Sequence, residues 1–96
     1  MLSIGSATQD VFLLGGAIFK PHNDAGVPTE HIPLGAKLEM EKVIFSTGGD
    51  AMNAATTFAR QGMHSMFMGI VGTDASGEAV MRVFDEEAID THYLHQ

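Results

Sequence analysis

The chain has 96 residues, which is enough for at most one domain and is near the lower limit for a parallel α/β unit. With 45% hydrophobic and 18% charged residues, its composition is typical of a globular protein with a core and excludes a disordered chain. Twelve acidic residues against five Lys and Arg give a formal net charge of −7, and no basic patch is visible. This balance argues against nucleic acid and anionic membrane surfaces as partners.

The absence of cysteine excludes disulfides, a thiolate metal site and a thiol nucleophile. The residues after Met1 show neither the basic region, the long apolar region nor the cleavage site of a signal peptide. No apolar run approaches the length that spans a membrane. We therefore expect a cytoplasmic protein.

The N-terminal third predicts two short strands and then a loop. Apolar residues at 2–5 and 11–14 flank a polar turn, and Asp10 lies at the junction, where forming a turn is the more common role of an aspartate. Residues 15–33 contain all three prolines together with glycine and Asx residues, which predicts a loop or an irregular hairpin. His22 and His31 lie there with no third ligand nearby in sequence, so we expect no metal site.

Strands and helices alternate after this loop. Residues 37–45 alternate charged and apolar side chains at first, which predicts a strand exposed on one face at its start. Residues 51–61 carry small or apolar side chains at helical spacing, and Gly62 stands where a helix would end. The continuously apolar run 65–71 predicts a strand covered on both faces, as in a parallel sheet. Strand, helix and strand would form a right-handed crossover unit.

A second turn leads into another helix, with Asp74 as its N-cap and Glu78 in its first turn. The end of the chain predicts an extended segment. His92 and His95 would point to opposite faces of a strand there, so we do not interpret them as a metal pair.

The stretch 46–55, Ser-Thr-Gly-Gly-Asp-Ala-Met-Asn-Ala-Ala, joins a predicted strand to a predicted helix and has the features of a binding site. Glycine lets a helix N-terminus approach a bound group closely. The spacing matches neither common phosphate-binding glycine motif, no lysine follows, and Asp50 would repel a phosphate. Asp50 and Asn53 offer acceptors and an amide donor, which suit the neutral hydroxyls of a polyol. The alternative is that Asp50 is only an N-cap and Asn53 a solvated first-turn residue.

Three motifs, read together, resemble the PfkB/ribokinase family of carbohydrate and nucleoside kinases. They are Gly5-Ser6-Ala7-Thr8-Gln9-Asp10, then Gly48-Gly49-Asp50-Ala51-Met52-Asn53-Ala54-Ala55 with Phe58-Ala59-Arg60-Gln61-Gly62, then Gly69-Ile70-Val71-Gly72-Thr73-Asp74-Ala75-Ser76-Gly77-Glu78. The resemblance implies an α/β fold, the N-terminal part of a ribokinase-like, Rossmann-type domain with a small β-sheet lid. It also implies transfer of the γ-phosphoryl group of ATP, with Mg²⁺, to a hydroxymethyl group of a sugar or nucleoside.

The same resemblance implies which residues bind the substrate. It assigns Asp10 to the substrate hydroxyls, assigns Gly49, Asp50 and Asn53 to the sugar, and gives Gly48 the role of shaping the turn. Asp50 is a departure, since ribokinase itself resembles Gly-Gly-Lys at this point. This departure argues against ribose and leaves fructose, a keto-deoxy sugar acid, a nucleoside or another polyol open.

The lid would come from strands at about 11–20, 37–45 and 91–95, and in ribokinase-like dimers such strands pair between subunits, so a homodimer is an expected assembly. The family's catalytic base, its anion hole and most of its ATP site lie in a Gly-Ala-Gly-Asp type segment that nothing here matches. We therefore expect residues 1–96 to be the N-terminal, substrate-binding portion of a longer kinase. It would be inactive alone, with no catalytic residue, metal ligand or cofactor contact of its own. The alternative is a non-catalytic binding or dimerising module.

Overall fold

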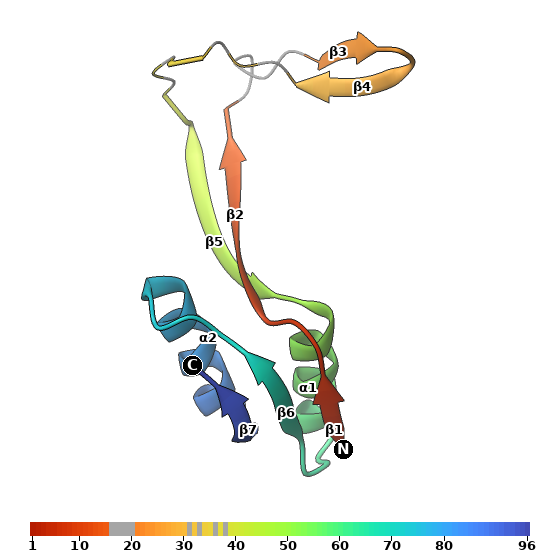
Figure 1. Cartoon of the computed structure of the whole chain (residues 1–96), viewed down its shortest axis with the longest axis vertical. Helices are drawn as coiled ribbons and strands as arrows, with labels where there is room; N and C mark the ends of the chain where they lie inside the picture. The colour runs from red at the N-terminus through yellow and green to blue at the C-terminus, as the bar shows by residue number, and fades with distance from the viewer. Residues whose placement is uncertain (16–20, 31, 33, 36, 38) are drawn as a thin grey trace. The chain divides into compact units, whose positions relative to one another are not determined.

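A computed structural model describes residues 1–15, 21–30, 32, 34, 35, 37 and 39–96, which form two compact units (Figure 1). The first unit comprises Met1–Asp10 with Phe45–Gln96, and the second comprises Val11–Ile44. The first unit contains every predicted site residue.

The first unit contains a three-stranded sheet. Its strands lie in the order β1 (Leu2–Ile4), β6 (Met66–Ile70) and β7 (Asp90–His95). Both strand pairs are parallel. Helix α2 (Ala75–Glu86) connects β6 to β7, and these three elements form a parallel strand–helix–strand unit. This alternation, together with the parallel sheet, defines an α/β fold. The crossover unit predicted from residues 37–45, 51–61 and 65–71 is wrong, because the strand before α1, β5 (Lys42–Gly48), pairs with β2 (Thr8–Leu14) in a separate sheet.

The prediction that residues 91–95 form a strand of the lid is wrong in this structure. Strand β7 pairs with β6 in the parallel sheet, with Met68 opposite Tyr93 and Ile70 opposite His95. The physical reason is the connection: a helix of twelve residues between two strands returns the chain parallel to the first strand. Residues 91–95 therefore belong to the body of the domain.

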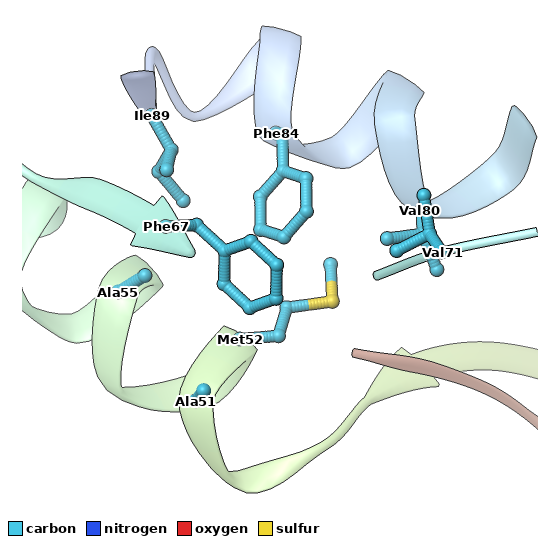
Figure 2. Close-up of a cluster of buried hydrophobic side chains, with 8 residues drawn as sticks. All are labelled: Ala51, Met52, Ala55, Phe67, Val71, Val80, Phe84 and Ile89. Carbon is cyan, nitrogen blue, oxygen red and sulfur yellow. The ribbon is translucent and has the colours of Figure 1, made fainter. Parts of the chain in front are cut away.

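Both helices pack on one face of this sheet. Helix α1 (Asp50–Arg60) and α2 enclose Phe67, whose ring centroid lies 4.6 Å from that of Phe84 (Figure 2). The alanines of α1 let its backbone come close to the strand, as its small-residue pattern predicts. The core consists of eight buried side chains: Ala51, Met52, Ala55, Phe67, Val71, Val80, Phe84 and Ile89.

The opposite face of the sheet is uncovered by the described residues. The register places Ile4 opposite Met68 and Met68 opposite Tyr93, so these side chains share a face. Exposure reaches 67% at Ile4 and 79% at Ile70. The prediction that β6 is covered on both faces is therefore wrong for the described residues. Its apolar sequence suits two covered faces, but only the face that carries Phe67 is covered.

The helix ends agree with the sequence signals. Helix α1 is followed by Gly62, whose φ is 84° and whose amide donates to the carbonyl of Ala59. Asp74 is the N-cap of α2, and its carboxylate accepts from the amide of Gly77 at 2.9 Å. Both predictions are confirmed.

In the second unit, β3 (Pro21–Asp24) and β4 (Val27–Glu30) form an antiparallel hairpin. Ala25 and Gly26 have φ values of 52° and 83°, the positive values of a tight hairpin turn. The segment 15–33, predicted to be a loop or an irregular hairpin, thus contains a regular hairpin at 21–30. Proline is compatible with it because both strands of a two-stranded sheet are edges.

Strands β2 (Thr8–Leu14) and β5 (Lys42–Gly48) pair with each other and contribute residues to both units. The predicted strand at 37–45 begins later than expected, at Lys42. The predicted strand at 11–20 ends at Leu14 in the described residues, and 16–20 lie outside them. His31 also lies outside the described residues.

Candidate functional site

Two connections of the first unit form the candidate site. One is the segment from β1 into the start of β2, which contains Gly5, Ser6 and Asp10. The other is the turn from β5 into α1, which contains Gly48 and Gly49. Asp10 adjoins Gly48 and the Ser6 backbone adjoins Gly49, so the two connections lie against each other where strands end and a helix begins.

Gly48 accommodates the carboxylate of Asp10. A Cβ atom on Gly48 would lie 2.6 Å from Oδ2 of Asp10 and 3.6 Å from the hydroxyl of Thr8. The Thr8 hydroxyl donates to Oδ1 of Asp10 at 3.2 Å. The structure therefore brings Asp10 and Gly48 together, and Asp10 keeps an exposed carboxylate for further hydrogen bonds.

Gly49 allows close approach between segments of the chain itself. Its φ is 98°, and a Cβ atom there would lie 2.6 Å from the carbonyl oxygen of Ser6. The sequence analysis predicted that this glycine lets a bound group approach the helix. In the structure, the backbone of Ser6 and Ala7 lies where the Gly49 side chain would be. Gly5 has the matching role, since its own Cβ would lie 3.1 Å from that of Ala51.

The amides in the first turn of α1 are occupied by protein acceptors. The amide of Ala51 donates to Oδ1 of Asp50, that of Met52 to the carbonyl of Ser6, and that of Asn53 to the carbonyl of Gly49. A helix N-terminus binds phosphate through such amides. Because these three already have acceptors, and because Asp50 adds negative charge, this helix start does not fit a phosphate group.

Asp50 is the first residue of α1, and Gly49 is the N-cap. The alternative interpretation of Asp50 as the N-cap is therefore wrong. Oδ1 of Asp50 accepts from the Ser6 hydroxyl at 2.7 Å, from the Ser6 amide at 3.3 Å and from the Ala51 amide at 2.8 Å. These hydrogen bonds, the Ser6 hydroxyl first among them, lower the pKa of Asp50 below its ordinary value.

Asn53 is exposed on the first turn of α1. Its side-chain amide makes no hydrogen bond within the described ranges, while its backbone carbonyl accepts from the Thr57 hydroxyl at 2.9 Å. Nor is there a hydrogen bond in that part of the chain between Asp10 and either Asp50 or Asn53. Asp10 and Asn53 thus both have polar atoms available to a ligand.

Sequence reasoning gave no role to Ser6, Gln9 or Ser76. Ser6 bonds to Asp50 and Met52, and Oε1 of Gln9 accepts from the Ser76 hydroxyl at 2.8 Å. The sequence signal for Ser6 and Gln9 was only the polarity of residues 6–10, and Ser76 was only a polar residue in the first turn of a predicted helix. A hollow of about 180 Å³ adjoins Gln9 and Ser76 at the carboxyl ends of β1 and β6.

No metal site is evident in the part of the chain that the structure describes, where no three His, Asp or Glu side chains cluster. Neither of the helices described there is long and apolar enough to cross a membrane.

The model of the pfkB family of carbohydrate kinases matches residues 9–96. Among curated proteins, the chain is similar to the bifunctional protein HldE of Magnetococcus marinus, with 30% identity over 92 residues. The match covers 96% of this chain and 17% of that protein.

Solved kinases share the fold. The ribokinase of Cryptococcus neoformans, solved with ADP, has a TM-score of 0.70 at 22% identity over 98% of this chain and 25% of that one. The fructokinase of Xylella fastidiosa has a TM-score of 0.67 at 21% identity over 99% and 24%. The aminoimidazole riboside kinase of Salmonella enterica has a TM-score of 0.65 at 20% identity over 97% and 23%. The chain thus spans about a quarter of these structures.

Proposed function

The chain belongs to the pfkB family of carbohydrate kinases, and from this premise we propose that it is the substrate-binding portion of an ATP-dependent sugar or nucleoside kinase. The observation that carries the proposal is the exposed Asp10 carboxylate beside Gly48, close to a helix start whose amides are already occupied. Carboxylate acceptors and an amide suit neutral hydroxyls better than phosphate. The substrate class is therefore a polyol.

Each site residue has a part in this proposal. Asp10 accepts hydrogen bonds from substrate hydroxyls, and Asn53 supplies an amide donor and acceptor. Gly48 leaves room for the Asp10 carboxylate, and Gly49 lets the Ser6 backbone pack on the helix start. Asp50 belongs to the same site.

ATP does not fit the helix starts of this chain. The α1 start is occupied as described, and at α2 the Asp74 carboxylate takes the amide of Gly77. No step through ATP or Mg²⁺ follows from these residues. We infer that the nucleotide and the catalytic base are bound by polypeptide corresponding to the remainder of the relatives, which the chain spans only in part. The uncovered apolar face of the sheet supports this, because parallel sheets bury both faces.

A second candidate function is a dimerising module. Strands β2 and β5 carry runs of exposed apolar residues, namely Val11, Phe12, Leu13, Leu14, Val43 and Ile44. Exposed apolar strand edges favour association with another chain. We propose that these strands form the lid and that they pair between two copies. A cytoplasmic location stays a prediction.

Calorimetric titration of the chain with D-fructose, D-ribose and adenosine tests the substrate assignment. We expect Asp10→Ala and Asn53→Ala each to weaken binding by roughly 1 to 3 kcal/mol, the cost of leaving ligand hydroxyls without partners. Asp85→Asn removes an exposed carboxylate on α2 and serves as the control. Absence of binding, or unchanged affinity in both site variants, would contradict the proposal.

A further inference from the structure

Within the described residues, Oδ1 of Asp50 accepts three hydrogen bonds, and two of them come from Ser6. Ser6 lies between β1 and β2, 44 positions earlier in the chain. A carboxylate that contacts only its own helix would be a capping group. This one connects two segments that are far apart in sequence.

The contact between Ser6 and α1 is reciprocal. While Asp50 accepts from Ser6, the Ser6 carbonyl accepts from the amide of Met52 at 3.2 Å. Gly5 and Gly49 permit this approach, since a Cβ atom on either would lie within about 3 Å of the other segment. Three hydrogen bonds and two glycines therefore hold the Ser6 segment against the helix start.

The Ser6 segment leads directly into the residue proposed to bind substrate. Only Ala7, Thr8 and Gln9 separate Ser6 from Asp10, and Gln9 is held by Ser76. Any movement of Ser6 away from α1 changes the path of the chain into Asp10. The geometry thus connects the Asp50 carboxylate to the position of the Asp10 carboxylate.

We propose that Asp50 is a positioning residue, whose Oδ1 holds the Gly5–Ala7 segment on α1 and thereby fixes Asp10. The significance of Asp10 rests on the proposed function, but the positioning does not, because it is a property of the free chain. The sugar contact implied for Asp50 by resemblance is not needed for this role. The depressed pKa of Asp50 agrees with it, since Ser6 is the first cause of that shift.

Amide hydrogen exchange of the 96-residue chain tests the attachment. We expect Asp50→Ala to speed exchange of the Met52 amide by about tenfold or more, because the loss of bonds to a charged acceptor releases Ser6. Asp50→Asn keeps an acceptor oxygen and should restore most of the protection. Asp74→Ala is the matched control, since it removes the carboxylate at the other helix start and should speed exchange at Gly77 alone.

NMR titration of carboxylate carbons supplies a readout that a capping role would not change. In Ser6→Ala the pKa of Asp50 should rise toward its ordinary value, and in Asp50→Ala the Asp10 carbon signal should shift while Asp74→Ala leaves it in place. Unchanged Met52 exchange in Asp50→Ala, or an unmoved Asp10 signal, overturns the proposal. Neither measurement uses a sugar, so failure here is distinct from failure of the substrate assignment.

Discussion

At the scale of single residues, Gly48 shows how a missing side chain can serve a site. Gly48→Ala would place a Cβ atom 2.6 Å from Oδ2 of Asp10, so the carboxylate must move. We expect this variant to lose sugar affinity in calorimetry while its thermal unfolding midpoint changes little.

Gly62→Ala is the contrasting variant. Its φ of 84° strains an alanine, but nothing lies within 4 Å of the added Cβ. We expect a lower unfolding midpoint, from a cost of about 1 kcal/mol, with sugar affinity retained. Equal affinity losses in the two variants would show that the Gly48 effect is unspecific.

The lowered pKa of Asp50 also predicts a pH dependence. A carboxylate whose folded-state pKa lies below its unfolded value of 3.8 stabilises the fold fully above that value. This stabilisation is lost as the pH falls through the folded-state pKa. Protection of the Met52 amide should therefore persist at pH 4 and fall only in stronger acid. Loss of protection already between pH 6 and 5 would contradict this assignment.

At the scale of elements, the two faces of the parallel sheet predict opposite responses to truncation. Phe84 is fully buried against Phe67. Phe84→Ala should cost about 3 to 5 kcal/mol of unfolding free energy, because it removes contacts and leaves a cavity. Ile70→Ala, on the uncovered face, should change stability by less than about 0.5 kcal/mol in urea denaturation. A large loss in Ile70→Ala would show that this face is covered in solution.

At the scale of the whole molecule, two apolar surfaces compete as sites of self-association. One is the exposed run of β2 and β5, and the other is the uncovered sheet face. If the lid strands pair between copies, Phe12→Asp should shift sedimentation toward the monomer, because it places charge on that run. Ile4→Lys should then leave the distribution unchanged. The reverse result would assign the association to the sheet face.

How much of this was predictable differs between elements. Local signals located α1, Gly62 and the Asp74 cap, because helical periodicity, glycine and capping chemistry act over a few residues. The lid assignment of 91–95 failed because the partner of a strand is set by tertiary pairing, which periodicity does not contain. In the candidate site, the sequence predicted Asp50 and Asn53 from their place after two glycines, and their contact with substrate stays a prediction. The role of Ser6 was not, because its partners lie on a distant segment.

The attachment of β1 has a consequence for the order of folding. This strand has three residues, and the ammonium group of Met1 donates to the carbonyl of His64, 63 positions away. Closing so long a loop costs chain entropy before the few contacts of β1 repay it. The β6, α2 and β7 segment, by contrast, is contiguous in sequence. We therefore expect β6 to α2 to β7 to form first and β1 to join last, so that the segment carrying Ser6 and Asp10 is also the first to detach.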